Sequence, residues 1–351
     1  MSNFLDKPYV REWVCSASKN YSTHIFGKVG HGVVWSDTRD ENNNFLIPLD
    51  PVGLVAGINS EPFIMTDGHD PGKPKGQLLE SKLFVDEGGR QFVVAIFGYY
   101  AGGDLLLFDT LGFDTKASAP IPQRLPELNP DTRVQLAIDP REVDKPWLDQ
   151  LIAKAEVPIE FLPRSNNAAN PALEFITVGL PYVLLVWNPL VTAIASEAGK
   201  ATYAAFAMWC RSLLVALESR KNPVLEIQAH QDGCQVSFLF RGTSVAKHLA
   251  AHESLPKTAS GAAQLITNLK KRGMQPQRLV YEFNYEGVIW YPSYAILNDK
   301  RIISNSAELI AIDKLPAELS LSFIEGHLVS PLADLVDSCV KSNNHLPERA
   351  D

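Results

Sequence analysis

One short turn in the last third of the chain constrains the fold more than any other feature. Asp232-Gly233 lies between two runs, 224–228 and 235–240, in which apolar and polar residues alternate with a period of two. An Asp-Gly pair between alternating runs is the strongest short-range signal for a two-residue β-hairpin. The sequence therefore predicts an antiparallel pair of strands in this region.

A helix and a second hairpin follow this turn. Residues 244–273 have a helical pattern, interrupted at Pro256, and end in basic residues followed by glycine, which suits a helix C-terminus. The segments 279–283 and 288–297 then predict two further strands. One helix covering an antiparallel sheet in the order ββαββ is an α+β arrangement, and we assign it to residues 221–330.

The first 165 residues have the character of a β-rich domain. The runs 77–85 and 90–99 are rich in β-branched and aromatic residues, and Asp86-Glu87-Gly88-Gly89 between them predicts a hairpin. We therefore expect a barrel or sandwich over residues 1–165. Together with the later module, this places the whole chain in the α+β class.

The middle of the chain predicts a connector. The polar, turn-prone stretch 163–171 marks a domain boundary, and we expect residues 166–220 to form a helical connector. Residues 172–195 are almost wholly apolar, and a bilayer span needs about 20 such residues. A glutamate, two prolines and an asparagine within the run, without flanking basic residues, favour a buried helical or mixed element over a membrane segment. A helix and tail are expected at 331–351.

Composition and charge narrow the function classes. The chain has 351 residues, of which 46% are hydrophobic and 21% charged, as in globular proteins. Its formal net charge is −8 and no run of Lys or Arg opposes it, so nucleic-acid or anionic-membrane binding lacks its electrostatic basis. The first residues show no secretory signal pattern, so we expect a cytoplasmic protein. No cofactor fingerprint is present, and we predict neither a cofactor nor a resident metal.

A histidine-aspartate pair introduces a family resemblance. The residues that carry it are, in order, Phe26-Gly27, Asp37, Asp40, Asn44, Pro48, His69-Asp70-Pro71 and Gly76. This order resembles the prohead (capsid maturation) serine proteases of tailed phages over residues 25–115. The resemblance implies that His69 belongs to a catalytic triad and that the nucleophile lies in a Ser-x-Gly-Phe-like segment. The best match here is Thr110-Leu111-Gly112-Phe113, which has threonine at the nucleophile position.

The implied peptidase site is His69 as base, Thr110 as nucleophile and an aspartate that orients the base. Asp104, Asp109 and Asp114 all qualify for the third role, and Asp109 enters the predicted site. The β-methyl of threonine crowds the attack, and threonine nucleophiles typically use an N-terminal amine as base. Ser118 is the nearest downstream serine, in a proline-rich stretch. The alternative is that His69 and Asp70 cap a turn in a Pro/Gly-rich loop.

Two other patterns in the α+β module bear on function. His230, Cys234, His248 and His252 have a spacing that zinc sites use, although a module with its own apolar core does not need a metal to fold. The second hairpin is rich in aromatic residues. We expect one aromatic row to lie in the core and the residues near Trp290 and Tyr294 to stay available for recognition.

Two functional hypotheses follow. The first is a non-enzymatic intracellular binding or assembly protein, built on a degenerate protease-like fold, that contacts a protein partner. The second is a serine/threonine-type endopeptidase that acts through His69 with Thr110 or Ser118. The incomplete triad favours the first.

Overall fold

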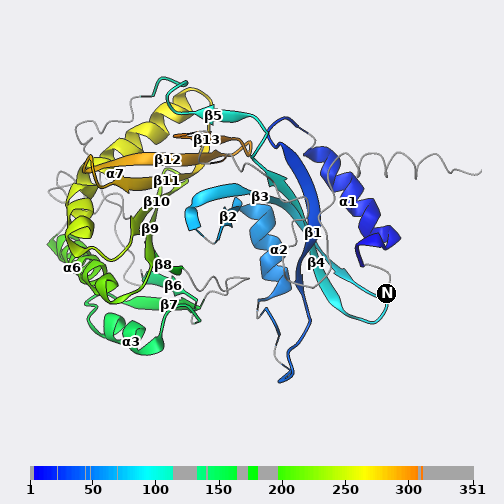
Figure 1. The fold of residues 1–351 in the computed structure, drawn as a ribbon, viewed down its shortest axis with the longest axis horizontal. Helices are drawn as coiled ribbons and strands as arrows, with labels where there is room; N and C mark the ends of the chain where they lie inside the picture. The colour runs from blue at the N-terminus through cyan, green and yellow to red at the C-terminus, as the bar shows by residue number, and fades with distance from the viewer. Residues whose placement is uncertain are drawn as a thin grey trace, which may run out of the picture. The chain divides into compact units, whose positions relative to one another are not determined.

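The computed structural model describes residues 4–21, 23–43, 45–47, 49–68, 70–113, 133–139, 141–163, 173–180, 197–306 and 310. The chain divides into two compact units. Unit 1 contains Met1–Met65, Pro74–Leu105 and Ile310–Asp351, and unit 2 contains Thr66–Lys73 and Leu106–Leu309. Helices and two sheets are both present, which confirms the predicted α+β class (Figure 1). Neither sheet closes into a barrel in the described part of the chain.

Unit 1 is built on a four-stranded sheet with the order β1-β4-β3-β2. Its elements are η1 (Phe4–Asp6), α1 (Pro8–Asn20), β1 (Lys28–Ser36), α2 (Pro51–Ser60), β2 (Phe63–Asp67), β3 (Asp70–Val85) and β4 (Gln91–Tyr99). Strands β1 and β3 both pair antiparallel with β4. The predicted hairpin is present, because Asp86 and Arg90 close the turn that joins β3 to β4.

The two α-helices in the described part of unit 1, α1 and α2, were not predicted. They lie on opposite faces of the sheet (Figure 1), and both begin with proline in the first turn. Asp50 caps α2, since its carboxylate accepts hydrogen bonds from the backbone N–H groups of Val52 and Gly53. An aspartate before a proline is a helix-start signature, so local sequence did encode this helix.

Unit 2 is built on a nine-stranded sheet with the order β5-β13-β12-β11-β10-β9-β8-β6-β7. Its strands are β5 (Leu105–Leu107), β6 (Val134–Ile138), β7 (Ile159–Pro163), β8 (Glu174–Leu180), β9 (Pro223–Gln231), β10 (Cys234–Arg241), β11 (Pro276–Asn284), β12 (Ile289–Leu297) and β13 (Ile302–Ser304). Its helices are α3 (Lys145–Ala153), α6 (Glu197–Ala216), η2 (Leu217–Ser219) and α7 (Val245–Lys271).

The predicted ββαββ module is formed by β9, β10, α7, β11 and β12. Asp232 and Gly233 have φ angles of 50° and 76°, the left-handed conformation that a two-residue hairpin turn requires. One pairing differs from the prediction. Strand β10 pairs with β11 in parallel, because α7 carries the chain back across the sheet between them. Helix α7 also continues through Pro256 without interruption.

The predicted helical connector, residues 166–220, contains the helix α6 but also a strand of the nine-stranded sheet. Residues Glu174–Leu180 form β8, which pairs with β6 on one side and with β9 on the other. Strands β6 and β7, which were assigned to the first domain, belong to the same nine-stranded sheet. Residues 181–196 and 331–351 lie outside the described residues. Among the helices that are described, none combines the length and apolarity needed to cross a membrane.

The two faces of the nine-stranded sheet have different chemistry. Side chains of α3, α6 and α7 pack on one face and form a large apolar core that includes Leu213, Phe238 and Leu265. Because side chains alternate along a strand, the neighbours of these core residues point to the opposite face. That face carries buried polar and charged residues, among them Thr177 and Glu226.

Candidate functional site

The structure describes only part of the predicted peptidase site. His69 and Ser118 lie outside the described residues. Thr110 is exposed in a turn after β5, where its hydroxyl donates a hydrogen bond to the main-chain carbonyl of Leu107 at 2.9 Å. Asp109 is also exposed, and its carbonyl accepts from Gly112 N–H in the same turn. The described contacts of Thr110 are therefore those of a turn-capping residue, and the triad stays a prediction.

Asp70, the neighbour of His69, belongs to a cluster that we call the Arg241 clasp: Asp70, Gly72, Arg241 and Glu282. The Arg241 guanidinium donates to both carboxylate oxygens of Asp70, at 2.9 and 2.7 Å. It also donates to Glu282 at 3.1 Å. The backbone N–H of Gly72 donates to Asp70 at 3.0 Å. The clasp therefore joins the segment Thr66–Lys73 to the ends of β10 and β11 within unit 2.

The charge of Arg241 and the close approach of the Gly72 backbone both shape the clasp. Burial lowers the pKa of Arg241, but the hydrogen bonds and charges of Asp70 and Glu282 outweigh burial, so its pKa lies above the ordinary value. A Cβ atom on Gly72 would overlap Glu282 Oε1 and Arg241 Nη2. Only glycine lets the backbone come this close to the ion pair. The clasp thus depends on the absence of a side chain at residue 72.

A second ion pair lies on the same polar face of the sheet. Glu226 is buried and accepts a hydrogen bond from Arg278 Nη2 at 2.9 Å. The pKa of Arg278 is lowered by burial but raised overall by Tyr294 and Glu226. Burial raises the pKa of Tyr294 to about 12, and its hydroxyl donates to the carbonyl of Pro71 at 2.7 Å. Ser237 Oγ and Arg278 Nε are buried without a hydrogen-bond partner among the described residues.

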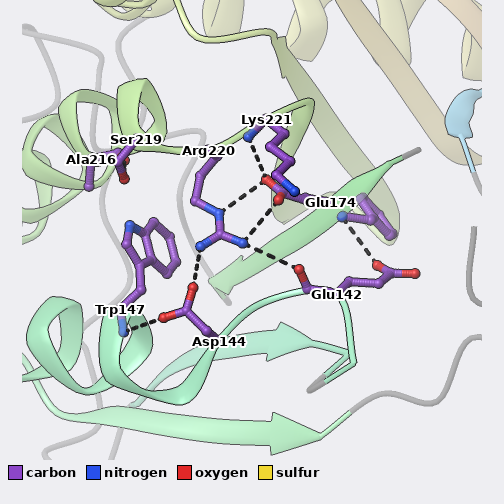
Figure 2. A network of polar contacts seen from close by, with 9 residues as sticks. Glu142, Asp144, Trp147, Glu174, Ala216, Ser219, Arg220 and Lys221 are labelled. Carbon is purple, nitrogen blue, oxygen red and sulfur yellow. Dashed lines mark hydrogen bonds and ion pairs between the residues drawn. The ribbon is translucent and has the colours of Figure 1, made fainter. Parts of the chain in front are cut away.

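A third network surrounds Arg220 near the start of β8 (Figure 2). The guanidinium binds both carboxylate oxygens of Glu174 at 3.0 Å and one oxygen of Asp144 at 2.5 Å. It also donates to the carbonyl of Glu142, and it lies over the Trp147 ring at 5.3 Å from the centroid. Burial lowers the pKa of Arg220, but the hydrogen bonds to the two carboxylates raise it overall. The network links α3, β8 and the segment before β9.

These three networks share one chemical property. Each guanidinium is bound by carboxylates of the same unit, so its charge is compensated inside the fold. Arginine and carboxylate groups held this way position backbone elements, because removing either partner leaves a poorly solvated charge. We therefore interpret them as structural contacts of unit 2.

The four residues of the zinc-like pattern do not form a common site. Cys234 pairs directly with Gln231, whereas His230 pairs with Gln235, so Cys234 and His230 point to opposite faces of the hairpin. His248 is buried with its two ring nitrogens 3.2 Å from the carbonyl oxygens of Leu214 and Arg241. In the described part of the chain, no group of three or more metal-ligating side chains is placed to hold a metal ion.

The predicted recognition row on the second hairpin is wrong. Trp290 is buried and donates from Nε1 to the carbonyl of Ala251 at 2.9 Å, while its ring packs against Phe238 and Phe240. Tyr294 is buried as well. Strand β12 lies between β11 and β13, so both of its edges are paired, and the side chains of Trp290 and Tyr294 are both needed for packing.

Unit 1 carries an exposed apolar surface that was not predicted from the sequence. We call it the α2 surface, and it consists of Phe45, Leu46, Leu49, Val52 and Phe63. Val52 and Leu46 are the most exposed of these, at 64% and 54%. A signal was present, because residues 45–60 contain a single charged residue, Asp50.

Packing under this surface explains its position. Trp35 Nε1 donates to the carbonyl of Ile47 at 3.0 Å, which fixes the loop before α2 against the sheet. Ile47 and Ile58 are buried in one apolar cluster, against which Leu54 and Met65 also pack. Side chains two residues apart in a strand share a face, so Phe63 lies on the face of Met65. The α2 surface therefore covers one side of the sheet of unit 1.

Comparison with known proteins gives no assignment. No family model, no curated protein and no solved structure matches the chain. The resemblance of residues 25–115 to prohead proteases stays a prediction from short motifs.

Proposed function

We propose that this protein is a non-enzymatic binding or assembly protein that holds a protein partner on the α2 surface of unit 1. The observation that carries the proposal is the composition of α2. None of its ten residues is charged, yet Ile58 is the only one that is buried. A surface helix of a globular protein normally carries polar and charged residues on its outer face. Apart from Asn59 and Ser60 in its last turn, α2 consists of apolar residues and glycine, and an exposed apolar surface of this kind is expected to be covered.

The neighbouring residues extend this apolar surface. Leu46, Leu49 and Phe63 are exposed beside or near the ends of α2. Full burial of a large apolar side chain contributes about 1.5–3 kcal/mol, and contiguous exposed apolar patches mark protein interaction sites. Five such side chains supply the apolar centre that a specific interface needs.

The polar networks of unit 2 support a binding role over an enzymatic one. The charges of Arg220, Arg241 and Arg278 are compensated by carboxylates within the fold. The Thr110 hydroxyl donates to a main-chain carbonyl. These contacts give the three arginines and Thr110 structural roles within unit 2, which favours the first of the two hypotheses.

A pair of variants tests the proposal. Leu46→Gln combined with Val52→Gln makes the surface polar at its two most exposed positions, where substitutions usually change stability by less than about 0.5 kcal/mol each. Met208→Gln is the matched control, because Met208 is 58% exposed on α6 of unit 2. The three proteins are cross-linked in extracts of the native cell, and the captured proteins are compared.

The expected result is a specific protein captured by the native chain and by Met208→Gln but absent from the double variant. Circular dichroism must show that all three proteins are folded. Identical capture by all three proteins, or no specific capture by the native chain, contradicts the proposed function.

A further inference from the structure

We infer that the segment bound by the α2 surface is a basic amphipathic helix of the partner protein. This inference rests on the proposed function and adds the chemistry of the partner. Between residues 38 and 65 the chain has four acidic residues and a single basic one, Arg39. The acidic residues, all exposed, are Asp40, Glu41, Asp50 and Glu61. An apolar surface with an acidic border is complementary to an apolar face bordered by Lys or Arg.

Arg39 does not reverse this charge. Its guanidinium lies over the Phe45 ring at 3.9 Å from the centroid, and it donates to the carbonyl of Asn43 at 2.8 Å. It is therefore held locally against the α2 surface. Glu41 and Glu61 are exposed, and along the sequence they flank the apolar residues of the segment 45–60.

The exposed side of α2 suits a helix as the bound element. Gly53, Ala56 and Gly57 are exposed on α2, and a Cβ atom added at Gly57 would contact nothing within 4 Å. Small residues leave the backbone open to close approach, and the distance between two packed helices depends on the side chains at their contact. Val52 stands beside these small residues as a projecting apolar side chain. A partner helix with large apolar residues can therefore fill the open space along α2.

Other occupants fit the charge less well. A second copy of this chain brings an identical acidic border, so like charges face each other across the interface. Nucleic acid and anionic membranes meet the same repulsion, in a chain whose net charge is −8. A basic helical segment is the occupant whose charge the surface favours.

The test uses two designed helical peptides of about 18 residues, or five turns, on the full-length protein. Both have the same leucine face, and their remaining positions carry Lys in one peptide and Glu in the other. Fluorescence anisotropy measures Kd at low salt and at about 150 mM salt, where the Debye length is about 8 Å. We expect the Lys peptide to bind at least about tenfold more tightly at low salt, since each exposed pair contributes about 0.2–1 kcal/mol.

Variants separate the apolar from the charged contribution. Asp40→Asn, Glu41→Gln, Asp50→Asn and Glu61→Gln together neutralise the border, and Asn at residue 50 keeps the N-cap of α2. The difference between the two peptides should then disappear. Leu46→Gln combined with Val52→Gln should weaken the binding of both peptides, whereas Met208→Gln should change the binding of neither.

The outcomes are distinct. If both peptides bind equally and independently of salt, and the Leu46→Gln/Val52→Gln variant abolishes that binding, the inference that the partner helix is basic is overturned. The proposed function is left intact. Binding of neither peptide overturns the inference, and it overturns the proposed function too if no partner is captured. Concentration-dependent self-association lost in the double variant assigns the surface to a second copy. Binding to anionic vesicles that is lost in the double variant assigns the α2 surface to a membrane. Self-association and vesicle binding each overturn the inference as well.

Discussion

Replacing Gly72 with alanine should break the Arg241 clasp. A Cβ at residue 72 overlaps Glu282 Oε1 and Arg241 Nη2, so at least one of these side chains must move away. Removing one partner from a buried ion pair costs about 3–5 kcal/mol. The Arg241 side chain is 30% exposed, which reduces this cost, and alanine lowers the entropy of the unfolded chain. We therefore expect a net loss of about 2 kcal/mol.

The assay is thermal and urea unfolding followed by tryptophan fluorescence and far-UV circular dichroism. For a unit of about 200 residues, this loss lowers the melting temperature by roughly 4–8 °C. Gly179→Ala is the matched control in unit 2, because a Cβ there makes only ordinary contacts of 3.5 Å with Gln135. The control should unfold within about 0.5 kcal/mol of the native chain.

A double-mutant cycle tests the cause of the effect. Glu282→Ala removes one of the two atoms that the new methyl group meets. The cost of Gly72→Ala should therefore fall by at least about 1 kcal/mol in the Glu282→Ala background. An equal cost in both backgrounds would refute the steric argument, and so would a Gly72→Ala protein as stable as the native chain.

Three further predictions concern other parts of the fold. Burial lowers the pKa of His31 from its usual 6.5 to about 4, so the unfolded chain binds a proton that the folded chain does not. His31 therefore contributes its full stabilisation above pH 6.5, and the free energy of unfolding falls by up to about 3 kcal/mol as the pH drops from 6.5 through 4. Urea titrations at several pH values should show a smaller pH dependence in His31→Gln, and parallel curves for the two proteins would contradict this prediction. Arg220→Met leaves Glu174, whose side chain is 13% exposed, without an ion-pair partner, so it should cost about 3 kcal/mol, whereas Asp144→Asn, at an exposed position, should cost less than about 1 kcal/mol; equal melting temperatures would be inconsistent with this contrast. The native chain should not cleave itself or casein, and cleavage that His69→Ala abolishes with the fold intact would restore the endopeptidase hypothesis.

Local signals in the sequence were sufficient for the strands and turns of the second half. The turn at Asp232-Gly233 depends on two residues that adopt positive φ angles, and period-two alternation fixes which side chains of β9 and β10 share a face. The N-cap signal at Asp50-Pro51 was equally local, although the β-rich pattern around it concealed α2. In each case the information lies within a few neighbouring residues, and short-range sterics and hydrogen bonding determine the outcome.

Tertiary structure alone decided the rest. Residues 174–180 are an apolar run that suits a buried helix as well as a strand, and pairing with β6 and β9 made it a strand. Arg241 and Asp70 are 171 positions apart, and no local pattern indicates that they meet. The exposure of Val52 and the burial of Trp290 could not be predicted from the sequence either, because both are apolar residues with apolar neighbours. Sequence determines which side chains prefer to leave water, but whether each one finds a partner depends on packing between distant segments.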